Sequence, residues 1–245
     1  MKSKEFNPCV IIPVYNHHHK ILEVLTELRQ YQLPCLLIDD GSDEECSTVL
    51  TSAAKTIPNV FLERLAVNSG KGAAVCKGLN LAFSRGYTHA IQVDADGQHN
   101  LGDIPQFLSC ALQNPAAVIS GQRDYLSMPK ARRAGRKLTD FWVRVNTLSN
   151  SITDSMCGYR LYPLQTTVDL LRQYSIGSRM DFDTDILVKL YWAGHQVINI
   201  PTRIEYFDDV PSHFDTIRDN VRISWMHTRL FFGMLKRFFT LLRRT

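Results

Sequence analysis

Short apolar runs alternate with amphipathic segments through the first half of this 245-residue chain. Apolar runs of four or five residues are typical of buried strands, whereas an apolar spacing of three or four, as at Ile21, Leu25 and Leu28, is typical of a helix. The runs predict strands at Cys9–Pro13, Cys35–Ile38, Phe61–Leu65, Ala90–Val93 and Ala117–Ser120. The segments between and beside them predict helices at Ile21–Tyr31, Glu44–Lys55, Gly72–Arg85 and Ile104–Gln113. This alternation predicts an α/β fold with a parallel central sheet and helices on both faces.

Polar clusters follow the first four predicted strands. They are Val14–Asn16, Asp39–Ser42, Asn68–Gly72 and Asp94–His99. Ligands of open α/β sheets bind beyond the carboxyl ends of the strands. We therefore expect the four clusters to form one site at one edge of the sheet.

The last thirty residues predict a basic amphipathic helix. From Ile217 to Arg244 there is no proline, and the basic residues Arg222, Arg229, Lys236 and Arg243 recur every seven positions. Apolar and aromatic residues occupy much of the remaining surface, which is typical of a helix that lies in a membrane interface. Packing on the catalytic core or on another chain is the alternative.

Composition and charge restrict the class of protein. The chain is 44% hydrophobic with a formal net charge of +4, so it can bury a full core, and the excess charge lies in the C-terminal segment. Basic residues there alternate with an apolar face, which argues against a nucleic-acid partner. We expect no signal peptide and no membrane span, hence a soluble or peripheral protein. Six cysteines without paired or zinc-type spacing predict reduced, buried thiols.

The acidic strand ends suggest metal and nucleotide chemistry. Asp94 and Asp96 directly follow an apolar strand, where two carboxylates can converge on Mg²⁺ or Mn²⁺ bridging a diphosphate. A turn rich in Asp and Gly is the alternative. Asp39 and Asp40 end another strand, and a carboxylate there can accept hydrogen bonds from ribose hydroxyls or a base imide. Ser42 or Asp43 is expected to cap the next helix.

Two further segments are weaker indications of a binding site. Gly70, Lys71 and Gly72 open a helix whose amides favour an anion, but the spacing fits neither a Walker A loop nor a dinucleotide fingerprint. Three consecutive histidines, His17–His19, predict a polar loop before the first helix rather than a metal cluster, because consecutive residues do not share a helix face.

Taken together, the order PVYN, DDGS, GKGAA and DADGQH resembles glycosyltransferase family 2, over about residues 9–207. The similarity is greatest to dolichyl- and polyprenyl-phosphate sugar transferases. It implies a GT-A fold and an inverting, metal-dependent enzyme using Mg²⁺ or Mn²⁺. Such an enzyme moves a sugar from a UDP- or GDP-linked donor to a lipid-linked or membrane-surface acceptor in glycolipid or cell-envelope biosynthesis. We expect a cytoplasmic protein, peripheral on the inner face of the cell membrane, and an oligomer is possible.

The resemblance also assigns roles to residues. Donor binding is implied for Pro13, Tyr15, Asn16, Asp39, Asp40, Lys71, Gly72, Asp94, Ala95, Asp96, Gln98 and Arg123. Asp94, Asp96 and Gln98 are the implied metal residues. The segment Asp154–Arg160 is similar to one that lines the acceptor side.

The general base stays open between three acids. The segment Met180–Leu187 is similar to one that supplies a base in processive relatives, but Phe182 stands where those have Glu. The candidates are Asp183, Asp185 and Asp154. A phosphate acceptor is already ionised and needs no base, whereas a hydroxyl acceptor does.

The expected organisation is a catalytic domain, 1–216, followed by the helix, 217–245. The donor half is about 7–121 and the acceptor half about 122–216. A basic run at Lys130–Lys137 is either a solvated face or a clamp for phosphates. A nucleotidyltransferase and a non-catalytic nucleotide-sugar-binding subunit are the alternative functions. The first usually has a Gly-rich signature that Tyr15–Lys20 lacks.

Overall fold

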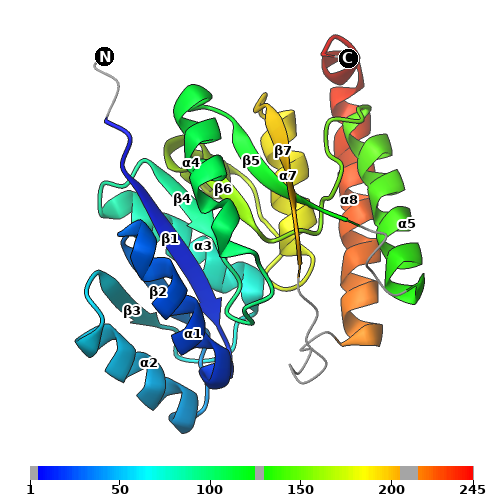
Figure 1. Ribbon diagram of the computed structural model, residues 1–245. Helices are drawn as coiled ribbons and strands as arrows, with labels where there is room; N and C mark the ends of the chain where they lie inside the picture. Colours follow the sequence, from blue (N-terminus) through cyan, green and yellow to red (C-terminus); the bar gives the residue numbers. More distant parts are fainter. Residues whose placement is uncertain (1–4, 125–129, 205–214, 245) are drawn as a thin grey trace.

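A central sheet organises the molecule in the computed structural model, which describes residues 5–124, 130–204 and 215–244 (Figure 1). Seven strands of the described chain lie in the order β3-β2-β1-β4-β6-β5-β7. Their bounds are β1 Pro8–Val14, β2 Cys35–Asp39, β3 Val60–Arg64, β4 His89–Gln92, β5 Val118–Arg123, β6 Arg160–Pro163 and β7 Val197–Thr202.

The helices of the first half agree with the sequence pattern. The bounds are α1 His18–Leu28, α2 Glu44–Thr56, α3 Lys71–Ser84, α4 Ile104–Gln113, α5 Lys130–Thr147, α6 Leu164–Gln173, α7 Phe182–Trp192 and α8 Thr216–Leu242. The predicted strands and helices are all present, with ends within three residues. One local prediction is wrong, because His18 and His19 lie in the first turn of α1 rather than in a loop.

Both faces of the sheet are covered, as predicted. Alternate residues of a strand point to opposite faces, and in β1 Cys9 and Ile11 belong to one hydrophobic core while Val10 and Ile12 belong to the other. The first core includes residues of α3, α6 and α7, and the second includes residues of α1, α2 and α4. The chain therefore has the layered α/β architecture that its alternation indicated.

The sheet departs from a purely parallel arrangement at β6. This strand lies antiparallel between β4 and β5, and its first residue, Arg160, pairs with Gln92 at the end of β4. The parallel prediction holds for β3-β2-β1-β4 and for the β5–β7 pair. Because β6 runs the opposite way, the loop before it arrives at the carboxyl end of β4. The antiparallel strand thus brings Asp154–Tyr159 to the edge where Asp94 lies.

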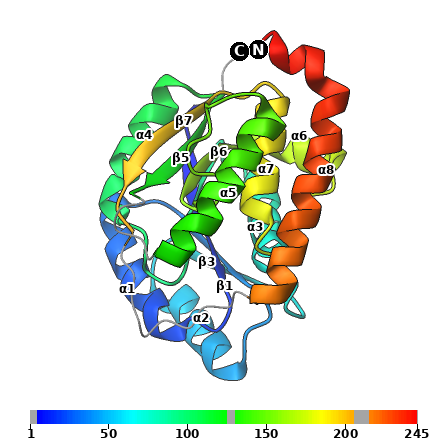
Figure 2. The same cartoon turned by 90° about the vertical axis from the view of Figure 1, so that its right-hand side faces the viewer.

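The C-terminal helix packs on the body of the protein, beside α5 and α7 (Figure 2). Its buried apolar residues include Met226, Leu230 and Met234. A Cβ atom at Gly233 would lie 2.6 Å from the Trp192 ring, so this glycine permits close packing. Arg244 donates hydrogen bonds of 3.0 Å to the backbone carbonyls of Tyr191 and Trp192, beyond which α7 ends. Within the described ranges, no helix is both long and apolar enough to cross a membrane.

Candidate active site

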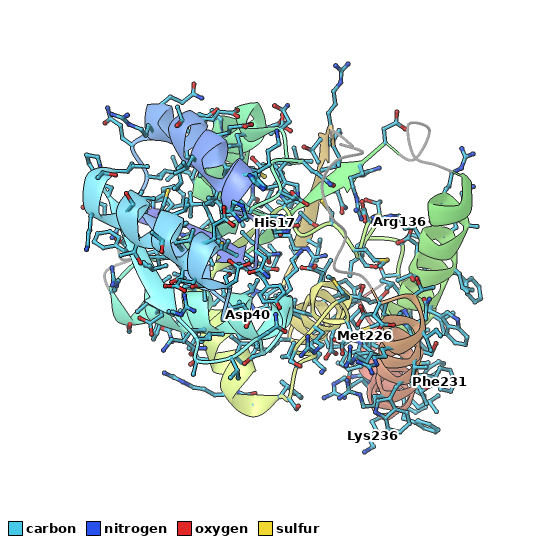
Figure 3. All side chains as sticks on the ribbon, turned by 90° about the horizontal axis from the view of Figure 1, so that it is seen from below. His17, Asp40, Arg136, Met226, Phe231 and Lys236 are labelled. Carbon is cyan, nitrogen blue, oxygen red and sulfur yellow. The ribbon has the colours of Figure 1, made fainter. Side chains whose placement is uncertain are left out.

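A cavity of about 1140 Å³ opens at the carboxyl ends of the strands. Figure 3 shows this edge from below, with His17 and Asp40 on one side of it and Arg136 of α5 on the other. The cavity walls include residues from all four polar strand ends, together with residues of α5, the start of α7 and the start of α8. The expected convergence of the four clusters is therefore present.

Most of the predicted site residues line this cavity. They are Pro13, Tyr15, Asp40, Lys71, Asp94, Ala95, Asp96, Gln98, Arg123 and Asp183. The other predicted residues are not among the lining residues, namely Asn16, Asp39, Gly72, Asp154 and Asp185. Each of these five has a structural contact that explains its position.

Asn16 ties the end of β1 to the start of α2. Its backbone is in the left-handed region, with φ of 54°, which asparagine tolerates better than most residues. Its amide N–H donates to Ser42 Oγ at 3.1 Å, and its Oδ1 accepts from the N–H of Asp43 at 2.9 Å. Asp43 in turn caps α2 by accepting from the N–H of Cys46. These contacts fix the turn that carries the cavity residue Tyr15.

The two adjacent acids after β2 do different things. Asp39 is fully buried, accepts from the N–H of Ser42 and forms a 2.7 Å ion pair with Arg64. Asp40 lines the cavity and accepts from the N–H groups of Ser69 and Gly70, both at 2.8 Å. Burial raises the pKa of Asp40, while these two hydrogen bonds oppose the rise. Asp40 therefore holds the loop that opens α3.

Glycines allow that loop to approach the start of α7. Gly70 has φ of 101°, which a side chain would strain. A Cβ at Gly72 would lie 2.5 Å from Cβ of Phe182. Arg179 closes the contact by donating to Asn68 Oδ1 at 2.9 Å. Gly72 thus contributes by close packing, and it leaves its neighbour Lys71 at the cavity wall.

Lys71 joins an acid from the first half of the chain to an acid from the second half. Its Nζ lies 2.9 Å from Asp94 Oδ2 and 3.2 Å from Asp183 Oδ2. Burial raises the pKa of Asp94, but the charges and hydrogen bonds of its neighbours, Lys71 foremost, together outweigh the burial and hold that pKa at about 2. Burial likewise lowers the pKa of Lys71, and the two carboxylates raise it above its ordinary value. Lys71 and Asp94 are therefore both ionised at neutral pH.

The acidic strand end has a donor set that suits a divalent cation. Asp94 Oδ1 is buried and has no hydrogen-bond partner among the described residues. Asp96 Oδ1 accepts from the N–H of Gln98 at 3.0 Å. Within 5–124, 130–204 and 215–244 no three His, Cys, Asp or Glu residues form a complete metal cluster. Mg²⁺ usually binds one or two carboxylates and completes its shell with water and substrate phosphates, so the residues present fit such an ion.

His99 also lines the cavity, although no role was predicted for it from the sequence. Its Nδ1 accepts from the N–H of Asp94 at 3.2 Å, which leaves the proton on Nε2, 3.7 Å from Asp94 Oδ2. Burial lowers the pKa of His99, so the ring is neutral at pH 7. It stacks on Tyr159, with 4.8 Å between ring centroids. The signal was its place in DADGQH, five residues after Asp94.

Two arginines tie the loop before β6 to its surroundings. Arg123 donates through Nε and NH2 to the two carboxylate oxygens of Asp154, both at 2.6 Å. Burial raises the pKa of Asp154, and Arg123 brings it below its usual value. Arg160 is fully buried and donates to the backbone carbonyls of Ser155 and Asp183. Arg160, the last residue of the predicted segment Asp154–Arg160, joins the loop before β6 to the start of α7.

The three candidate bases differ in access. Asp185 is 1% exposed, lies 2.7 Å from Lys189 and accepts from the N–H of Gly177. Asp154 is buried in its pair with Arg123. Of the three, Asp183 is the one that lines the cavity.

Arginines from α5 and α8 also line the cavity. They are Arg136 of α5 and Arg218 and Arg222 of α8, and the last two pair with Asp215 and Asp219, which line the cavity as well. The predicted basic run therefore contributes Arg136 to the site, whereas the side chains of Lys130 and Arg132 lie outside the described residues.

Known proteins match this chain in sequence and in fold. The model of the family "Glycosyl transferase family 2" matches residues 9–175. An uncharacterized protein of Methanocaldococcus jannaschii is 28% identical over 84% of this chain and 91% of its own. A dolichyl-phosphate beta-glucosyltransferase of Dictyostelium discoideum is 29% identical over 89% of this chain and 74% of its own. An undecaprenyl-phosphate mannosyltransferase of Micrococcus luteus is 26% identical over 78% and 80%.

Solved structures agree on the fold. The mannosyltransferase PcManGT of Pyrobaculum calidifontis, solved with GDP-Man and Mn²⁺, has a TM-score of 0.55 at 17% identity, over 80% of this chain and 55% of its own. S. aureus TarS 1-349 with UDP-GlcNAc has a TM-score of 0.63 at 14% identity, over 91% and 66%. This chain thus spans less than two thirds of either solved chain. The architecture is the GT-A fold, and by the match over 9–175 this chain belongs to glycosyl transferase family 2.

Proposed function

We propose that this protein is an inverting glycosyltransferase that moves a sugar from a UDP- or GDP-sugar to the phosphate of a polyprenyl- or dolichyl-type lipid. Relatives named for such lipid acceptors cover most of the chain. The observation that carries the proposal is one cavity that has an acidic strand end at Asp94 and Asp96 and also holds the arginines Arg136, Arg218 and Arg222 of α5 and α8. These two features suit a nucleoside diphosphate held through a cation and an anionic acceptor.

The donor half supplies the nucleotide side of the proposed site. Pro13, Tyr15 and Asp40 line the cavity where β1 and β2 end, and they are placed to contact the base and ribose. The amides at the start of α3 and the cation of Lys71 favour the diphosphate. Asp94 and Asp96, with Gln98 beside them, would hold Mg²⁺ or Mn²⁺, which when bound stabilises negative charge on the departing diphosphate.

The transfer itself needs few protein groups. An oxygen of the lipid phosphate attacks the anomeric carbon and forms the new C–O bond. The bond from that carbon to the diphosphate breaks, and its electron pair leaves with the nucleoside diphosphate, so the configuration inverts. Arg136, Arg218 and Arg222 line the side of the cavity where an anionic acceptor is attracted.

We propose that Asp183 positions groups rather than removing a proton. It is paired with Lys71 at 3.2 Å and accepts from Gln92 Nε2 at 3.3 Å. An ionised phosphate has no proton to lose in the attack. Asp183 therefore serves to hold Lys71 and the start of α7 in place.

We propose further that α5 and α8 form the membrane-facing surface. Large apolar side chains on these helices are exposed, including Phe141 at 55%, Trp225 at 62% and Phe239 at 78%. Trp225, Phe232 and Phe239 lie seven residues apart, and the basic series Arg229, Lys236 and Arg243 follows each of them by four. On a helix these series are neighbouring stripes. Apolar rings beside cations suit an anionic membrane interface. In this proposal the protein is peripheral on the inner face of the cell membrane.

The test is a transfer assay with radiolabelled UDP-glucose and GDP-mannose, polyprenyl phosphate in vesicles, and Mn²⁺. We expect label in the lipid phase together with a nucleoside diphosphate, and loss of both products with EDTA. Pyrophosphate release would indicate a nucleotidyltransferase, and binding without any product would indicate a non-catalytic sugar-nucleotide subunit. If the sugar nucleotide were hydrolysed at the same rate with and without polyprenyl phosphate, the proposal of a lipid-phosphate acceptor would be contradicted.

A further inference from the structure

An ammonium group lies where a cation is needed in the proposed reaction. Lys71 Nζ is within 3.2 Å of both Asp94 and Asp183, and these two carboxylates come from distant parts of the chain, the turn after β4 and the start of α7. The Lys71 side chain is 20% exposed and Asp183 is 9% exposed, so water neutralises these charges poorly. Lys71 is thus the nearest positive charge that the structure shows for both acids.

The surroundings keep Lys71 in this bridging position. Gly158 leaves the space beside it, since a Cβ there would lie 2.7 Å from Lys71 Nζ. Gln92 donates to the other oxygen of Asp183, and Tyr162 donates to Gln92 at 3.2 Å. The ammonium is therefore held in a built polar setting rather than on a mobile surface arm.

We propose that Lys71 is a resident counter-cation, which keeps Asp94 closed to a free divalent ion until the diphosphate of a donor draws the ammonium away. A divalent ion that approaches Asp94 alone meets the positive charge of Lys71 within a few ångströms. A donor diphosphate removes that obstacle, because Lys71 begins α3 and can pair with the phosphates, and Asp94 Oδ2 then becomes available beside Oδ1, which is already unpaired within the described part of the chain. Metal and donor then bind together, each tightening the other by the same factor.

This inference rests on the donor site of the proposed function, yet its test does not depend on turnover. The probe is Mn²⁺ alone, with its dissociation constant measured by the electron paramagnetic resonance of free Mn²⁺. In Lys71→Met we expect Mn²⁺ to bind at least about tenfold more tightly than in wild type, because one like charge near the ion is gone. UDP and GDP should strengthen Mn²⁺ binding in wild type and do so much less in Lys71→Met.

Two matched variants locate the effect. Lys77→Met removes a lysine of the same helix whose partner, Glu63, lies outside the cavity lining, and its Mn²⁺ affinity should equal that of wild type. The double variant Lys71→Met with Asp94→Asn should lose the gain in Mn²⁺ affinity that Lys71→Met alone produces. If Lys71→Met is unstable, Lys71→Gln is used, and Mn²⁺ should raise its melting temperature more than that of wild type.

The outcomes separate the two proposals. Tighter Mn²⁺ binding in Lys71→Met supports the counter-cation whether or not sugar transfer is detected. Equal or weaker Mn²⁺ binding in that variant, in a protein that transfers sugar, overturns the counter-cation and leaves the function standing. A gain that persists after Asp94→Asn also overturns it, because the added ion would then bind elsewhere.

Discussion

Gly158 leaves room for Lys71: a Cβ atom added to Gly158 would lie 2.7 Å from Lys71 Nζ, and also 3.1 Å from Asp94 Oδ2. The two residues are 87 positions apart in sequence. They meet because β6 runs antiparallel to β4 and so delivers the loop before it to the end of β4. The missing side chain is thus a condition for the ion pairs at the centre of the site.

Gly158→Ala is expected to impair the site more than the fold. The atoms that the methyl meets first are the ends of the Lys71 and Gln92 side chains, at 2.7 and 2.9 Å, which can shift, so we expect a loss of stability of about 1 kcal/mol. The displaced ammonium leaves Asp94 and Asp183, and we expect kcat/KM to fall at least about tenfold. Thermal unfolding and transfer kinetics on the same preparation measure the two effects. An unchanged kcat/KM would argue against a role in transfer for the space that Gly158 leaves beside Lys71.

Asp183→Asn tests the positioning role of that carboxylate. We expect kcat to fall by about tenfold to a hundredfold because Lys71 loses one partner. The acidic limb of the pH profile of kcat should stay where it is in wild type, since no proton is removed by Asp183 in our mechanism. Loss of that limb in the variant would instead identify Asp183 as a general base.

Asp185→Asn should act on stability rather than on the chemistry. Its carboxylate is buried 2.7 Å from Lys189 and accepts a hydrogen bond from Gly177. Removing the charge leaves a largely buried ammonium without this partner, and we expect a loss of about 3 kcal/mol in the free energy of unfolding. The rate per folded molecule, determined at a temperature well below melting, should equal that of wild type. A rate that falls without a change in stability would speak for a catalytic Asp185.

Asp154→Asn should change the pH dependence of stability. The pKa of Asp154 in the folded protein lies below its usual value because of Arg123. The pair therefore stabilises the fold above the unfolded pKa of about 3.9, and that stabilisation is lost as the pH falls through the folded pKa. Urea unfolding at pH 7 should show the variant less stable by about 3 kcal/mol. The difference in free energy of unfolding between wild type and variant should shrink as the pH drops below 4. A difference that stays constant with pH would exclude this coupling between Asp154 ionisation and stability.

Trp225→Ser together with Phe239→Ser should weaken membrane binding. Both rings are largely exposed on α8, so the fold loses little, while the apolar contact with an anionic interface is reduced. We expect at least about tenfold weaker co-sedimentation with phosphatidylglycerol-containing vesicles.

Leu112→Ser is the matched control for the membrane face, since Leu112 is 61% exposed on α4, a helix of the opposite sheet face. Point substitutions are preferable to truncation, because removal of residues 229–245 would also take away the buried Leu230 and Met234. Equal losses in the control and in the double variant would count against a specific membrane surface.

Local sequence information determined much of this protein. The apolar periods at Cys9–Pro13 or Ile104–Gln113 specify a strand or a helix through contacts with near neighbours, and a parallel arrangement puts the polar strand ends at one edge. The place of Tyr15, Asp40, Lys71 and Asp94 at that edge was therefore predictable from the sequence. The family resemblance supplied Arg123 and Asp183.

Tertiary structure decided what these residues touch. Nothing in the sequence near Arg160 shows that β6 enters the sheet antiparallel, since that depends on contacts with β4 and β5, which are distant in the chain. The same long-range packing buries Asp185 against Lys189, pairs Asp154 with Arg123 and places Asp183 beside Lys71. Three acids that look alike in the sequence thus differ in their surroundings, because burial and the nearest opposite charge belong to the folded chain and not to the residue.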